Sequence, residues 1–300
     1  MGNVLHMPAR ILAIAGATYT QLIRMRLFVV LAVIAVGFLG LQFVPYQENL
    51  GVEFQGIGQL ELIKDVAMGC MRLISMIFCV AATALLIPKD SEDRILYTIL
   101  CKPVPRFDYL TGKALGVLAL LGTLLLFMDA LMALQLWLKE GALAVELQET
   151  LAARGYEAED IAPYLQQLAN AGNSWNVQRS ILAMVLGYGV LTTYTLLISC
   201  FTSGTIVSII FALGAYFIGM FQGQLFWLIS SGIGTSQLAQ WIERAAALLV
   251  PDFSLYSVSD TAAGGVELSW ALLGSLGGIA LAYMAMHLLL SAWIFSHKEF

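Results

Sequence analysis

Long stretches without charged residues alternate with short charged segments along this chain. No charged side chain occurs between Arg26 and Glu48, and none occurs from Ser180 to Ile242. Because an uncharged apolar run of about 18 residues or more can cross a bilayer as a helix, the pattern predicts an all-α integral membrane protein with six transmembrane helices. The spans are expected at about 27–44, 66–88, 114–138, 180–200, 205–229 and 268–295.

An amphipathic segment precedes the first span. Over 8–26, apolar residues such as Ile11, Ala15 and Leu22 recur at helical spacing, whereas the arginines lie elsewhere. Pro8 suits the first turn of a helix. The segment is therefore predicted to form a helix that lies in the membrane interface and does not cross it.

Two connections are too polar to cross a membrane. Residues 139–178 contain two apolar stripes separated by Gly155, which predicts a helical hairpin outside the bilayer. Residues 230–267 are expected to form a second outer loop, which contains a short amphipathic helix around Leu238 to Val250.

The composition indicates that lipid is the solvent of this chain. Of its 300 residues, 59% are hydrophobic and 12% are charged, against roughly half and a quarter in soluble domains. A net charge of −5 provides no basic face for nucleic acid. The four cysteines form no CxxC pair and have no neighbouring histidine, so they are expected to pack as small apolar residues.

Basic residues are unequally distributed between the two sides that alternate spans define. Nine of the 15 Lys and Arg residues fall on the side of the N-terminus, including five in the 89–113 loop. Five fall on the other side, together with most of the acidic residues. By the positive-inside bias, we expect both termini and this loop to be cytoplasmic in a multi-pass protein of the bacterial cytoplasmic membrane.

The 89–113 loop is expected to contain a helix of its own. Asp90 or Ser91 suits its N-cap, and Pro103 and Pro105 stop it, so the helix should end at about Cys101. Its apolar side needs a covering surface, which a partner protein or the membrane face can supply. The side chains concerned are Ile95, Leu96, Ile99 and Leu100.

The order of residues through this loop follows a family pattern. Its elements are Glu92, Arg94, Ile99-Leu100, Lys102-Pro103-Val104, Arg106 and Leu110-Thr111-Gly112-Lys113. This order resembles the cytoplasmic coupling helix that joins spans two and three in ABC-2 type permeases, in particular those of transporters that mature nitrous-oxide reductase. Pro105 and Ile95 stand where that family usually has Ser and Thr. Residues 249–260 and 294–300 are similar to the same family, so the resemblance covers essentially the whole chain.

The resemblance implies a permease subunit that dimerises with itself or a similar permease, works in export, and is not an enzyme. Separate cytosolic ABC ATPase subunits are expected to bind ATP and Mg, because the chain lacks a GxxxxGK[ST] loop and holds no cofactor or metal site of its own. A polytopic membrane enzyme or a scaffold without an ATPase is the alternative. The residues expected to couple to the ATPase are Glu92, Arg94, Leu96, Ile99, Lys102, Pro103, Pro105 and Arg106.

Arg72 and Asp129 are the two fully charged residues inside the expected spans. Because an isolated charge at membrane depth is costly, we expect these side chains to form a salt bridge, with contact to substrate as the alternative role. His287 is expected to be a packed histidine. Close helix packing is expected at the glycines of span six, which are Gly274, Gly277 and Gly278.

The acidic outer hairpin favours a cationic or metal-linked cargo or a periplasmic partner. However, the orientation bias alone gives any such protein an acidic outer face. The sequence therefore leaves the transported substrate open.

Overall fold

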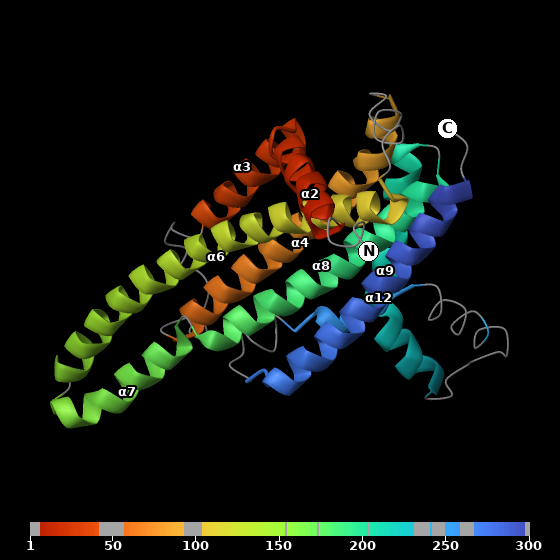
Figure 1. Cartoon of the computed structure of the whole chain (residues 1–300). Helices are drawn as coiled ribbons and strands as arrows, with labels where there is room; N and C mark the ends of the chain where they lie inside the picture. The colour runs from red at the N-terminus through yellow and green to blue at the C-terminus, as the bar shows by residue number, and fades with distance from the viewer. Residues whose placement is uncertain are drawn as a thin grey trace.

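The computed structural model describes residues 7–41, 57–92, 104–153, 155–172, 174–202, 204–230, 241, 250–258 and 267–297. Within this part of the chain the regular structure is helical and no strand forms, so the all-α prediction is confirmed for these residues (Figure 1). The helices are α2 (Met7–Ile23), α3 (Arg26–Leu41), α4 (Ile57–Glu92), α6 (Arg106–Ala153), α7 (Ala158–Ala171), α8 (Trp175–Phe201), α9 (Thr205–Ser230), the short 3-10 helix η2 (Ser254–Tyr256) and α12 (Trp270–His297).

Five helices of the described part are long and apolar enough to cross a membrane, namely α4, α6, α8 with α7, α9 and α12. A sixth span exists if α2 and α3, which meet at an angle of 66°, form one together. The sequence predicts a complete span over 27–44, whereas α3 is described only as far as Leu41. Residues 42–44 of the predicted span lie outside the described part of the chain. The coarser prediction of a multi-pass helical membrane protein agrees with the structure.

Helix α8 lies in the interior of the bundle. It packs against α4, α6, α9 and α12, which explains why its sequence has no polar face. The outward faces of α3, α9 and α12 carry large apolar side chains, for example Val33, Phe211 and Leu281, which are 65%, 62% and 64% exposed. In a membrane protein, lipid covers such a surface.

The expected hairpin begins as part of a longer helix. Helix α6 continues for 48 residues, so the predicted span 114–138 and the first half of the hairpin form one rod of about 72 Å. Gly155, with a φ of 87°, allows the chain to turn, and α7 then packs back on α6. The result is the projecting pair of helices in Figure 1.

Exposed tryptophans lie on three helices of the bundle. Trp137, Trp175 and Trp270 lie on α6, α8 and α12, and Arg179 on α8 lies 5.0 Å from the ring centroid of Trp270. Tryptophan is enriched at the membrane–water interface. Residues 138–153 of α6, which follow Trp137, rise by about a further 24 Å toward the tip of the hairpin.

Helix α2 packs closely across the start of α6. Gly112 and Gly116 form the crossing: a Cβ atom at Gly112 would lie 2.7 Å from the Cβ of Ile14, and one at Gly116 would lie 2.6 Å from the Cβ of Thr18. Small residues four apart let helix backbones approach in this way. The helix predicted over 8–26 is therefore attached to the bundle along its buried side.

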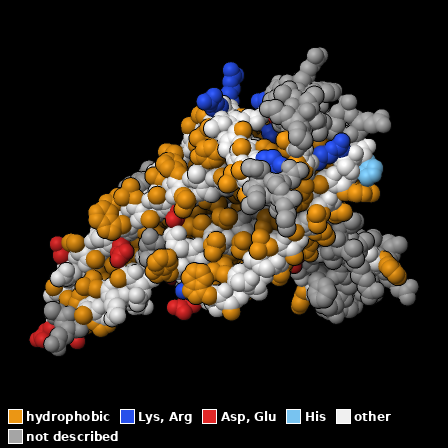
Figure 2. Space-filling model, viewed as in Figure 1, with side chains coloured by type: hydrophobic (Ala, Val, Ile, Leu, Met, Phe, Trp, Pro, Cys, Tyr) orange, Lys and Arg blue, Asp and Glu red, His pale blue; other side chains and the backbone are white. Residues whose placement is uncertain are grey.

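The two ends of the bundle differ in charge. Figure 2 shows Lys and Arg side chains at the end where α2 and α6 begin, and Asp and Glu side chains toward the α6–α7 hairpin on this face. The positive-inside bias therefore predicts that the end with Arg10, Arg26 and Lys113 faces the cytoplasm.

This orientation can be measured with a thiol reagent that does not cross membranes. In a variant whose four native cysteines are replaced, Glu157→Cys on the exposed hairpin should be labelled in intact spheroplasts, and Pro105→Cys should be labelled only after permeabilisation. The cysteine-free parent is the control. Labelling of Pro105→Cys in intact spheroplasts would show that the basic end faces the outside, which is the opposite orientation.

Candidate functional site

A buried ion pair joins α4 to α6 at the basic end. The ammonium nitrogen of Lys113 lies 2.6 Å from Oδ2 of Asp90, and the hydroxyl of Tyr109 donates to the same oxygen at 2.5 Å. Asp90 is fully buried and Lys113 is 5% exposed. A buried charge pair is tolerated only with good geometry and further hydrogen bonds, which the Tyr109 hydroxyl supplies here.

Contacts from α2 extend this network. Lys113 also donates to Oε1 of Gln21 at 3.3 Å, and Arg10 forms an ion pair of 2.8 Å with Asp108. Helix α2 therefore contacts the first turns of α6 through two polar side chains, Gln21 and Arg10. We call the Asp90–Lys113–Tyr109 group with Gln21 the buried clamp.

Helix α12 reaches the same end through Phe295. Arg106 donates to the backbone oxygen of Phe295 and lies 5.9 Å from the centroid of its ring. The ring of Tyr109 stacks on the same phenylalanine at 6.1 Å. The first turn of α6 is thus attached to the last turns of both α4 and α12.

In the sequence, Asp90 precedes the expected coupling segment, and Tyr109 and Lys113 follow it. Arg94, Leu96, Ile99, Lys102 and Pro103 lie outside the described residues, as does most of the helix expected over 91–101. Of the other coupling residues, Glu92 ends α4, Pro105 is exposed just before α6, and Arg106 begins α6.

The expected N-cap role of Asp90 or Ser91 is not what the structure describes. Helix α4 continues through both residues to Glu92, and the carboxylate of Asp90 binds Lys113 and Tyr109. A side chain engaged in this way is not available as a cap. The sequence does contain a usable signal, because an acid and a base stand on the two helices that flank one loop in a chain with few charges.

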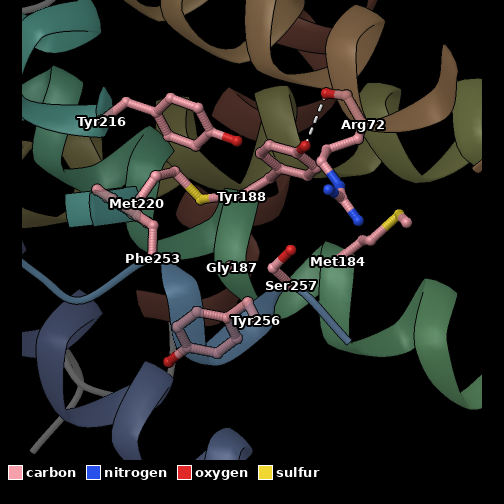
Figure 3. Close-up of a pocket in the computed structure, with 9 residues that line it drawn as sticks. All are labelled: Arg72, Met184, Gly187, Tyr188, Tyr216, Met220, Phe253, Tyr256 and Ser257. Atoms are coloured by element: carbon pink, nitrogen blue, oxygen red, sulfur yellow. Dashed lines mark hydrogen bonds between the residues drawn. The ribbon is translucent and has the colours of Figure 1, made fainter. Parts of the chain in front are cut away.

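A small pocket lies in the middle of the bundle. Figure 3 shows Arg72 of α4 facing residues of α8, α9 and the segment around η2. The pocket contains about 310 Å³ of empty volume, including the part open to the outside. Its lining consists of Arg72, Met184, Gly187, Tyr188, Tyr216, Met220, Phe253, Tyr256 and Ser257.

Glycines on α8 and α9 leave the space in which the segment around η2 packs. A Cβ atom at Gly187 would lie 2.8 Å from the Cβ of Tyr256, and one at Gly219 would collide with the backbone oxygen of Pro251. The segment 250–258 therefore fits between α8 and α9. The sequence shows that this segment resembles a family motif but does not indicate where it packs.

The expected salt bridge between Arg72 and Asp129 is replaced by other contacts. Among the residues that the structure describes, no ion pair joins the two; Asp129 accepts a hydrogen bond of 3.0 Å from Gln178. The hydroxyl of Tyr188 donates to the backbone oxygen of Arg72 at 2.7 Å. Gln178 and Tyr188 are ten residues apart on α8, about 15 Å along its axis, so the two charged residues lie at different heights.

The remaining sequence predictions have mixed outcomes. His287 is buried, and its Nδ1 lies 3.2 Å from the hydroxyl of Thr193, which agrees with a packed histidine. Cys70, Cys79 and Cys200 are free thiols. Gly274 and Gly278 have no atom within 4 Å of a Cβ position, so close packing within the described chain does not occur there. The described residues contain no cluster of three metal-ligating side chains.

No protein-family model matches this sequence, and no curated protein matches it either. The fold defines a helical protein with several candidate membrane spans.

Proposed function

We propose that this protein is the permease subunit of an ATP-driven ABC-2 type exporter of the bacterial cytoplasmic membrane. It works as a dimer with a second copy or a similar permease, and both termini are cytoplasmic. Separate cytosolic ATPase subunits bind ATP and Mg and dock on the segment 91–106. The permease carries the pathway and performs no chemistry.

The observation that carries this proposal is the buried clamp. A permease without its own ATP site must receive motion through the loop on which the ATPase docks. Here the two ends of that loop are held together by Asp90 and Lys113, which are both buried. A displacement of the loop therefore acts on α4 and α6 together and is not lost in a flexible connection.

Helix α2 receives the same displacement. Gln21 contacts Lys113, Arg10 contacts Asp108, and the glycine crossing holds α2 on α6. Docking at one loop can thus move several helices as one group. An enzyme or a scaffold has no evident need for such an arrangement beside a loop whose sequence predicts a helix with an apolar face.

Replacing Leu96 or Ile99 with Asp should weaken binding of the ATPase by about thirtyfold. A charge at the apolar centre of a docking surface costs about 2 kcal/mol or more, and every 1.4 kcal/mol is tenfold in affinity. Membrane insertion should be unaffected because no span is altered. Quantitative mass spectrometry of proteins that copurify with the tagged permease measures the effect.

Val145→Asp is the matched control, because Val145 is 57% exposed on the opposite, acidic end of the molecule. It should copurify with the normal amount of ATPase. If the wild-type chain copurifies with no ATPase, the enzyme or scaffold alternative is favoured. If the Leu96 and Ile99 variants retain the normal amount, the loop is not the docking site.

A further inference from the structure

We propose that the bend between α2 and α3 is a docking site for the headgroups of anionic phospholipids. Arg24 and Met25 lie between the two helices and Arg26 begins α3; we call these three residues the elbow. The two guanidinium groups bind the lipid phosphates, and the apolar faces on either side contact the acyl chains. The site is defined within one chain, so it does not depend on the permease proposal.

The two arginines of the elbow are exposed and have no counter-charge. Within the described part of the chain, neither Arg24 nor Arg26 takes part in an ion pair. Three other basic side chains at this end are used inside the protein: Arg10 and Lys113 pair with buried aspartates, and Arg106 donates to a backbone oxygen. The first turn of α3 also contains no acidic residue. The elbow therefore presents two positive charges to its surroundings.

Large apolar side chains are exposed on both sides of these charges. Leu12 and Ile23 are exposed on α2, and Val29 and Val30 are exposed on α3 directly after the elbow. Basic residues beside an exposed apolar surface are typical of segments that lie at a membrane surface. Water is a poor environment for such a surface, whereas acyl chains cover it.

The bend places the elbow at the surface of the bilayer. Helices α2 and α3 meet at 66°, on the outside of the bundle (Figure 1). Unpaired arginines at membrane depth are costly, so a bend that carries two of them is expected at the level of the headgroups. Helix α3 then enters the lipid, while α2 remains on α6 through the glycine crossing.

Charge and apolar surface together define the occupant. A guanidinium binds phosphate oxygens through parallel N–H groups, and a headgroup with net negative charge, such as that of phosphatidylglycerol, is attracted more strongly than a zwitterionic one. A soluble anion would use the charges but leave the apolar faces uncovered. An anionic phospholipid uses both.

The elbow is close to the buried clamp along the chain. Gln21, which contacts Lys113, lies three residues before Arg24 on the last turn of α2. Lipid bound at the elbow therefore holds the end of α2 that touches the clamp. The composition of the membrane can act on the clamp by this route.

Exchange of lipids at the elbow tests the proposal. The full chain, with its native cysteines replaced and with Thr20→Cys carrying a bimane fluorophore, is reconstituted in nanodiscs of phosphatidylcholine and phosphatidylglycerol. Thr20 is exposed one turn before Arg24, and its hydroxyl donates only to carbonyls of its own helix. Lipids of either class that carry a nitroxide near the headgroup quench the fluorophore. The two quenching curves give the preference for one lipid over the other.

The parent should prefer phosphatidylglycerol, and Arg24→Gln and Arg26→Gln should each lower this preference about fivefold, the usual effect of one basic residue near an anionic surface. Arg24→Lys and Arg26→Lys should keep most of it, because an ammonium also binds phosphate. Both side chains are exposed, so all four variants should unfold at the temperature of the parent. An unchanged preference in both glutamine variants overturns the proposal.

Lys139→Gln is the matched control, because it removes the same charge from the opposite end of the molecule, where Lys139 is partly exposed on α6. It should leave the preference at the elbow unchanged. An equal loss in this variant would show that net charge decides the preference and that the elbow is not a site.

Two further measurements separate a lipid from other occupants. Inorganic phosphate at constant ionic strength should not reduce the preference, because it has no acyl chain; displacement by phosphate would indicate a site for soluble anions and contradict the proposal. The Arg24→Gln, Arg26→Gln double variant should copurify with the normal amount of ATPase. Loss of the ATPase with an unchanged lipid preference would make the elbow a protein-docking surface instead. The quenching measurement uses no ATPase, so failure of the permease proposal leaves its result intact.

Discussion

Asp90→Asn should lower the free energy of unfolding by about 3 kcal/mol or more, because it leaves the ammonium of Lys113 buried without its carboxylate. Asp90 is 0% exposed and Lys113 is 5% exposed, so water cannot replace the lost partner. Lys113→Met should cost a similar amount, since it strands the carboxylate instead. The double variant should lose much less than the sum of the two, because no charge is then stranded.

Denaturant titration in mixed micelles measures this coupling. Lys89→Met is the control: Lys89 is the neighbour of Asp90 but is partly exposed, so its replacement should change stability by about 0.5 kcal/mol or less. Strictly additive losses in the double variant would show that Asp90 and Lys113 do not interact in the folded protein.

Gly116→Leu should destabilise the protein by about 3 kcal/mol and detach α2 from α6. A Cβ atom at this position would lie 2.8 Å from the backbone oxygen of Ala15 and 2.6 Å from the Cβ of Thr18. Neither atom is the end of a flexible side chain, so one helix must move. Faster trypsin cleavage at Arg24, between α2 and α3, reports the detachment.

Gly122→Leu on the same helix separates packing from helix propensity. Gly122 has no atom within 4 Å of its Cβ position, and replacing a helical glycine should by itself stabilise the helix. This variant should therefore be at least as resistant to trypsin as the wild type. Equal cleavage of the two variants would mean that the glycine crossing does not hold α2.

The elements of this fold follow from the sequence because a helix that crosses lipid needs a long run of uncharged residues. Long uncharged runs mark α8 and α9, and the small polar residues between them mark the turn, which the structure has between Phe201 and Thr205. Gly155 likewise marks the hairpin turn. The rule does not show where a helix ends once it leaves the bilayer, so the continuity of α6 into the hairpin is not predicted.

The candidate sites depend on which helices meet and at what height. Arg72 and Asp129 were paired because they are the only charges within the expected spans, but counting charges does not give their levels along α8. Asp90 and Lys113 lie on the two helices that one loop joins, which is information the sequence contains. The packing of α2 on α6 requires knowing which face of each helix turns inward, and Gly112 and Gly116 alone do not give it.

The length of α6 makes it a lever. Its 48 residues contain no proline, so one continuous helix runs from the buried clamp to the acidic hairpin. A tilt of about 5° at the clamp displaces the far end of a 72 Å rod by about 6 Å. A movement caused by binding at the basic end is thus carried by α6 to the hairpin at the opposite end. A fluorescent label on the hairpin would detect that movement.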